Sequence, residues 1–261
     1  MVTITAMGCG AGGEVSEVSL PMRVAGGLSP AETDLGYTVT VSRMRVAARD
    51  LTFKVPGDGL ALGVDVGAVG FGDDLDDELG GPQGVLAPPE PAHPGHGSGG
   101  VVTGELAGDY VIDWSQGDRV LGTALLLSGD YIGADFGFRR AGPGDGLDLD
   151  DPLLGHSVHI EGTVVRDGIA RGFDAVFDLD DGAQVQDIAF EQRIGDDAGF
   201  ALSISLLITD PYRGETLFDG VDFAALAAPN GAHVAIRPGD EAANRIRRAV
   251  QVHDHYLVSA D

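Results

Sequence analysis

The sequence predicts an all-β fold: an antiparallel β-sandwich with a long acidic and proline-rich loop and a short C-terminal helix. Apolar and polar residues alternate in many short segments, Gly, Asp and Pro turns separate these segments, and helical periodicity is scarce. Many short strands without helices between them favour antiparallel pairing over a parallel sheet. With 261 residues, of which 43% are hydrophobic, the chain can form one domain with a full core.

Most strands are predicted from a period of two in hydrophobicity. The first covers residues 16–24. The second covers residues 37–53, where the apolar phase slips between Val41 and Met44 and predicts a β-bulge near Ser42. Further strands are expected at residues 60–69, 101–114, 119–127, 131–138 and 185–193.

Two later segments show the alternation most clearly. In residues 158–179, apolar residues share one face before and after a turn at 166–168, which predicts a hairpin. Residues 201–208 place leucine and isoleucine inward and Ser203 and Ser205 outward.

Helix is expected mainly near the C-terminal end of the sequence. Asp240 is suited to an N-cap, and apolar residues recur at helical spacing at Ala243, Ile246 and Val250. Residues 214–227 predict a further short turn of helix.

Residues 1–15 form a segment that resembles the lipobox of bacterial lipoproteins. Gly8 precedes Cys9, the only cysteine, and a glycine-rich spacer follows, although Ala6 stands where leucine is usual. The resemblance implies a lipid on Cys9 as the only contact with a membrane; the alternative is an N-terminal tail with an incidental cysteine. We expect residues 16–261 to form a single domain.

The net charge of −25, from 41 acidic and 16 basic residues, argues against binding to nucleic acid or to anionic lipid headgroups, because both would be repelled. Cations are the favoured small partners. Adaptation of the surface to salt is the alternative explanation of this charge.

One long loop, residues 70–100, breaks the strand rhythm and ends in His-Pro-Gly-His. Pro94 and Gly95 fit the central positions of a type II β-turn, which would bring His93 and His96 within about 7 Å, Cα to Cα. The two imidazoles could then bind one metal ion. The alternative is a solvated polar turn, since two ligands alone make a weak site.

The other histidines supply candidates for further ligands. His156 and His159 should point to opposite faces of a strand, with His156 the better ligand and His159 solvated or paired with Glu161. We expect an extended segment around His253 and His255, and favour His255 as the ligand. His233 stands alone, as packed or surface histidines do.

Several segments together resemble an uncharacterised group of bacterial lipoproteins built around an Ala-His-Pro-Gly-His segment. They are GYTVTVSRMRVAARDLTF, AHPGHGSGGVVTGELAGDYVIDW, GHSVHIEGT, LFDGVDFAAL and HDHYLV, and they span most of the chain. The resemblance implies an envelope protein with a histidine metal site, with His93, His96, His156 and His255 as its ligands. The sequence departs from the group at Asp130, where the pattern has histidine.

The leading hypothesis is therefore an envelope protein that binds Zn(II) or Cu(II) for sequestration, buffering or delivery. Imidazole ligands suit both ions, and the methionines are remote from the histidine pairs. The partners would be the metal ion and an envelope transporter or acceptor protein. The alternatives are an adhesion or carbohydrate-binding sandwich with incidental histidines, and a metallohydrolase with Glu105 or Glu161 as general base.

Overall fold

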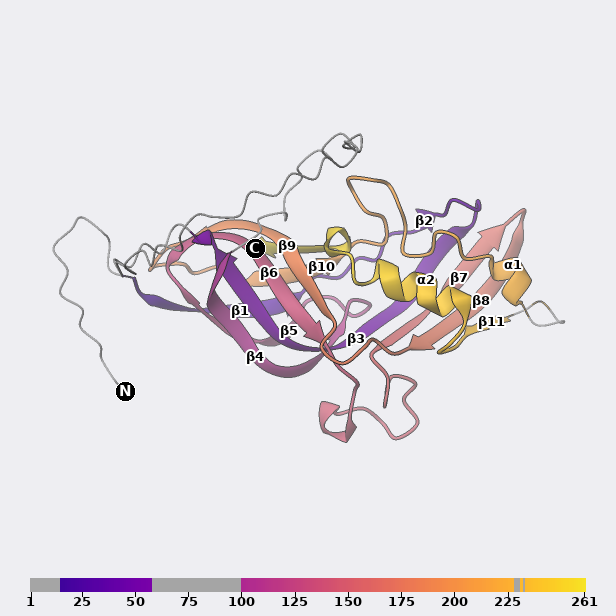
Figure 1. Ribbon diagram of the computed structural model, residues 1–261, viewed down its shortest axis with the longest axis horizontal. Coiled ribbons are helices and arrows are strands. Elements are labelled where there is room, and N and C mark those ends of the chain that lie inside the picture. Colours follow the sequence, from indigo (N-terminus) through magenta and orange to yellow (C-terminus); the bar gives the residue numbers. More distant parts are fainter. Residues whose placement is uncertain (1–14, 58–99, 228–230, 232) are drawn as a thin grey trace, which may run out of the picture.

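A computed structural model of the protein describes residues 15–57, 100–227, 231 and 233–261, and most of these residues lie in one large β-sheet (Figure 1). The strands are β1 (Glu17–Val24), β2 (Ala31–Glu32), β3 (Thr38–Val55), β4 (Val101–Asp113), β5 (Arg119–Leu127), β6 (Gly129–Phe138), β7 (Val158–Arg166), β8 (Ile169–Phe177), β9 (Gln184–Ile194), β10 (Leu202–Leu206), β11 (His233–Ile236) and β12 (Tyr256–Ala260). The helical elements are η2 (Pro143–Asp145), α1 (Phe223–Leu226), α2 (Glu241–Ala249) and η3 (His253–His255). The prediction of a strand-rich fold with few helices is confirmed.

The sheet is mixed, so the predicted antiparallel arrangement is not confirmed. Where successive strands pair, they pair antiparallel, as β3 does with β4 and as β7 does with β8 in the predicted hairpin. Three pairings are parallel: β1 with β10, β8 with β11, and β9 with β12. These join segments far apart in the chain, and alternation of hydrophobicity does not encode the direction of a distant partner.

Eight strands form a closed ring. In order they are β3, β4, β5, β1, β10, β12, β9 and β6, and β6 then pairs with β3. Aromatic side chains fill the interior: the Phe53 ring lies 5.5 Å from the Phe190 ring and 6.4 Å from the Tyr131 ring, centroid to centroid. Trp114, Phe136 and Tyr256 continue this core.

A second part of the sheet extends from the ring. The first half of β3 continues beyond the ring and pairs with β7, which pairs with β8 and then β11 (right half of Figure 1). One face of this extension is apolar, and Phe173 of β8 packs there against Phe218 and Phe223. The opposite face carries charged side chains and histidines.

The β-bulge predicted near Ser42 is confirmed. The register of β3 against β7 shifts between Val41 and Arg43, and Ser42 and Arg43 are both exposed in succession. After the shift Met44 is buried like Val41 before it. The bulge thus keeps the apolar residues on one face and places Arg43 on the polar face.

Two local expectations are wrong. Ser203 is buried, because its hydroxyl lies 2.9 Å from that of Ser259 on the neighbouring β12. Residues 253–255 form a 3₁₀ turn, in which the His255 N–H bonds to the Val252 carbonyl, and the chain becomes extended only at Tyr256. The prediction of Asp240 as the N-cap residue of α2 is confirmed, although its carboxylate accepts from the Arg237 N–H and not from an N–H of the helix.

Several predictions fall outside the described residues: the lipobox-like segment with Cys9, the strand at 60–69, most of the loop at 70–100, and the turn with His93 and His96. Among the residues that the structure does describe, no helix is long and apolar enough to cross a membrane.

We expect Phe53→Ala to lower the free energy of unfolding by about 3–5 kcal/mol, because the substitution leaves a cavity beside the Tyr131 and Phe190 rings inside the closed ring of strands. Urea unfolding measures the change. Leu149→Ala, at a side chain that is 91% exposed, is the matched control and should change stability by less than about 0.5 kcal/mol. Equal effects of the two substitutions would contradict the assigned core.

Candidate functional site

His156, one of the predicted ligands, lies just before β7 and is partly exposed. Its Nδ1 is 3.0 Å from Oδ1 of Asp178, which follows β8. The carboxylate can only accept, so Nδ1 carries the hydrogen and donates it. Nε2 has no partner among the described residues and is open to a further ligand.

His255, another predicted ligand, is buried in η3. Its Nδ1 is 2.9 Å from the Leu207 carbonyl oxygen, and this oxygen can only accept. Burial lowers the pKa of His255, although that hydrogen bond and the nearby carboxylates of Asp210 and Asp254 act in the opposite direction. The ring is therefore neutral at neutral pH, with its lone pair on Nε2.

The structure does not bring His156 and His255 together into one cluster. They belong to different elements and have separate partners, Asp178 for the first and Leu207 for the second. Within the described ranges, no group of three or more His, Cys, Asp or Glu side chains is arranged to hold a metal ion.

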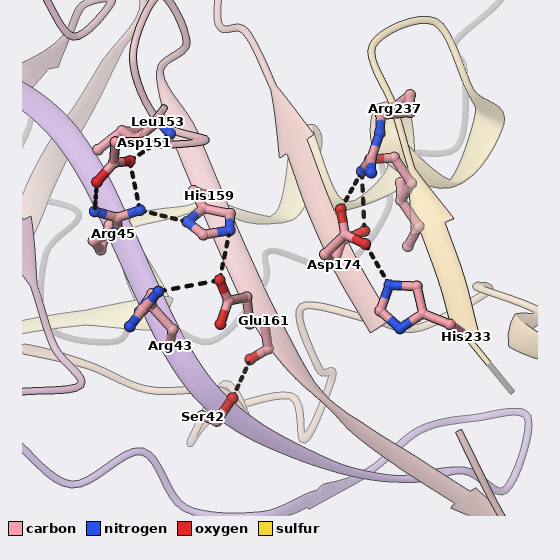
Figure 2. A network of polar contacts seen from close by, with 11 residues as sticks. Ser42, Arg43, Arg45, Asp151, Leu153, His159, Glu161, Asp174, His233 and Arg237 are labelled. Atoms are coloured by element: carbon pink, nitrogen blue, oxygen red, sulfur yellow. Dashed lines mark hydrogen bonds and ion pairs between the residues drawn. The ribbon is translucent and has the colours of Figure 1, made fainter. Parts of the chain in front are cut away.

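His159 is buried, contrary to the expectation of a solvated side chain, but its expected pairing with Glu161 is confirmed. Its Nε2 lies 3.1 Å from Glu161 Oε1, and its Nδ1 lies 2.7 Å from Nη2 of Arg45 (Figure 2). A guanidinium only donates, so Nδ1 accepts and Nε2 donates. Both ring nitrogens are occupied, which makes His159 a poor metal ligand.

Arg45 is the centre of a polar network on this face of the sheet. Its guanidinium donates two hydrogen bonds to Asp151, of 2.7 and 2.8 Å, besides the one to His159. The hydrogen bond from Arg45 lowers the pKa of Asp151. Arg43, on the same face of β3 as Arg45, pairs with Glu161 at 3.1 Å and is more exposed than Arg45. The network therefore alternates positive and negative groups from β3, β7 and the segment that precedes β7.

A second, exposed group lies across β8 and β11. Asp174 accepts hydrogen bonds from His233 through Oδ1 and from Arg237 through Oδ2 (Figure 2). Burial would raise the pKa of Asp174, but the bonds from Arg237 and His233 outweigh burial and lower it. The His233 side chain is 55% exposed, which agrees with a surface histidine.

A polar cavity of about 320 Å³ lies beside His156, and sequence reasoning did not find it. Its lining residues come from the loop after β8, from α2 and from the end of β6, and include Arg140, Asp178, Asp180 and Arg247. Asp178 contacts both His156 and the cavity lining. Its Oδ1 lies 3.0 Å from His156 Nδ1, and its Oδ2 lies 3.3 Å from Nη2 of Arg140. No sequence pattern links these segments, which meet only in the folded chain.

The remaining candidates are accounted for by other contacts. Asp130, at the position where the lipoprotein group has histidine, is exposed and lies 3.8 Å from Arg193. His253 Nε2 lies 3.1 Å from Asp254 Oδ1. Glu161 already pairs with Arg43 and His159, which leaves it poorly placed to act as a general base.

Comparison of the chain with protein-family models, with curated proteins and with solved structures finds no match.

We expect Arg45→Met to lower the free energy of unfolding by about 3–5 kcal/mol, because it removes the cation from a largely buried ion pair and leaves Asp151 without it. Arg43→Met is the matched control. Its ion pair with Glu161 is 45% and 36% exposed on the two sides, so the loss should be below about 1 kcal/mol. Chemical denaturation distinguishes the two; a small effect at Arg45 would show that the network does not stabilise the fold.

Proposed function

We propose that the protein binds Zn(II) or Cu(II) in the bacterial envelope and serves in sequestration, buffering or delivery of the metal. The observation that carries the proposal is the hydrogen bonding of two predicted ligands. In both His156 and His255, Nδ1 donates to an oxygen acceptor, and Nε2 has no partner among the described residues.

This arrangement is typical of metal-binding histidines, which donate their second ring nitrogen to a carboxylate or carbonyl. Such a bond fixes the orientation of the ring and makes the free nitrogen a better ligand. Asp178 has this role for His156, and the Leu207 carbonyl has it for His255. His159, whose nitrogens are both occupied, gives the contrast within the same chain.

The primary ligands in this proposal are His93 and His96, which the Pro-Gly turn would hold close together. Two imidazoles need one or two more ligands for a stable Zn(II) or Cu(II) site. His156 and His255 are proposed to complete the shell. Since they lie on separate elements, each needs its own test.

The location and partners of the protein follow from the same proposal. A lipid on Cys9 would hold the protein at the membrane, and an envelope transporter or acceptor protein would exchange the metal with it. The net charge of −25 supports attraction of cations to the surface.

The first test is a competitive titration of untagged protein with Zn(II) and with Cu(II). Wild type should bind about one equivalent of metal, and the double variant His93→Ala, His96→Ala should lose it, since removing both turn ligands leaves too few for a stable site. Unchanged affinity in the double variant would overturn the proposal and favour an adhesion or carbohydrate-binding protein with incidental histidines. Metal-dependent hydrolysis of an ester or phosphoester would favour the metallohydrolase.

The second test concerns the carboxylate that orients His156. We expect Asp178→Asn to weaken metal binding about 10- to 100-fold, because the amide would orient the ring less firmly and make it less basic. Asp180→Asn, at an 87% exposed neighbour, is the matched control and should leave the affinity unchanged. His156→Ala should weaken binding at least as much as Asp178→Asn. Normal affinity in both His156→Ala and Asp178→Asn would remove His156 from the site.

A further inference from the structure

The segment between β6 and β7, residues 139–157, is held to β3 by backbone hydrogen bonds at its ends, from Arg139 N–H to the Ala47 carbonyl and from Ala47 N–H to the Ser157 carbonyl, and by two groups of side-chain contacts. The first is Arg139, whose guanidinium pairs with Asp145 and donates to the Ala48 carbonyl at 2.9 Å. The second is Asp151, which accepts two hydrogen bonds from Arg45 and one, of 2.8 Å, from the backbone N–H of Leu153.

The second attachment also carries an apolar contact. Leu153 is fully buried in a small cluster with Ala47, Val111 and Ala141. The backbone around Leu153 is closed by hydrogen bonds from Gly155 N–H to the Ala141 carbonyl and from Ala141 N–H to the His156 carbonyl. Residues 148–156 are therefore attached to the sheet through Arg45, through one small cluster and, at their end, through the contact of His156 with Asp178.

The contact between Arg45 and His159 requires a neutral His159 with its hydrogen on Nε2. The Arg45 Nη2 lies 2.7 Å from His159 Nδ1 and 2.8 Å from an Asp151 oxygen, so one guanidinium nitrogen donates to both groups. A proton on Nδ1 would set an N–H against an N–H at hydrogen-bond distance, and two cations side by side. Nε2 offers no alternative acceptor, because it carries the hydrogen of the neutral ring and lies 3.1 Å from Glu161 Oε1.

We propose that His159 is an acid-responsive switch: its protonation displaces Arg45 and releases residues 148–156 from the sheet. The charged groups around His159 are Arg43 and Arg45 on β3, Glu161 on β7 and Asp151 on the segment itself. On β8 the residue paired with His159 is the uncharged Val176. Arg139 contacts no histidine among the described residues, so the attachment through Asp145 should persist.

The direction of the effect follows from the environment of the closed state. Burial and the Arg45 cation lower the pKa of His159 below its ordinary value of 6.5. The released state restores a more ordinary pKa and so binds the proton more readily. Closure is therefore fully favoured above about pH 6.5 and is weakened as the pH falls from there through the lowered pKa of the closed state.

Release of this segment does not depend on the proposed metal binding. Because His156 is the last residue of the segment, release of the segment would also move this candidate ligand. Only this effect on metal binding rests on the proposed function. The metal-free protein is therefore the right sample for the test.

The experiment measures amide hydrogen exchange of residues 148–156 at about pH 7.5 and about pH 5, corrected for the intrinsic rate at each pH. Protection in wild type should fall by up to about tenfold per pH unit between the ordinary and the lowered pKa, while amides of the β7–β8 ladder stay protected. Equal protection of the segment at both pH values would overturn the proposal.

The variant His159→Gln separates the switch from general acid effects. A glutamine amide can accept from Arg45 and donate to Glu161 but does not titrate in this range, so protection should become independent of pH. His233→Gln, at the exposed histidine on the same face, is the control and should keep the wild-type pH response.

A titration of the histidine side chains of wild type by NMR tests the same mechanism without a substitution. His159 should titrate below 6.5 with a midpoint that coincides with the opening of residues 148–156. A midpoint that differs from that of the opening would overturn the proposal even if His159→Gln failed to fold.

Discussion

β3 pairs along both edges over its 18 residues, and both halves of the fold depend on these pairings. Its second half lies between β4 and β6 and closes the ring. Its first half pairs with β7 and starts the extension. A strand of this length spans about 60 Å, so one continuous backbone fixes the ring and the extension relative to each other.

The bulge at Ser42 decides what the extension can do. Without the extra residue, the alternation would place either Val41 or Met44 in solvent, and the arginines next to them would meet the apolar core. With it, Arg43 and Arg45 face the same side as Glu161 and His159. The bulge that keeps the apolar residues of β3 buried therefore also brings the residues of the polar network together. The network in turn holds the segment that leads to His156.

Sequence reasoning succeeded where the physical signal is local. The hairpin of β7 and β8 and the bulge in β3 both follow from alternation and turn residues. It failed where a distant segment supplies the partner. The parallel pairings of β10, β11 and β12 have no local signature, and the buried Ser203 has its hydroxyl partner, Ser259, on a strand more than fifty residues away in sequence.

The same distinction applies to the candidate site. His156 and His255 were preferred from spacing, and each has one ring nitrogen held by an oxygen that the sequence could not identify, on Asp178 and Leu207. The burial of His159 could not be foreseen, because Arg45, Asp151 and the segment above it come from three places in the chain. Alternation placed this residue on the polar face, and the fold then covered that face.

The local environment of His159 and His255 affects their pKa more than the overall charge of the chain does. A net charge of −25 favours protonation of histidines, yet the pKa of both His159 and His255 is lowered. Long-range attraction is screened within about 10 Å by salt, whereas burial and a guanidinium in direct contact act without that screening. Two neutral imidazoles thus persist in an acidic protein. One has both nitrogens in contact with its neighbours, and the other keeps a lone pair on Nε2.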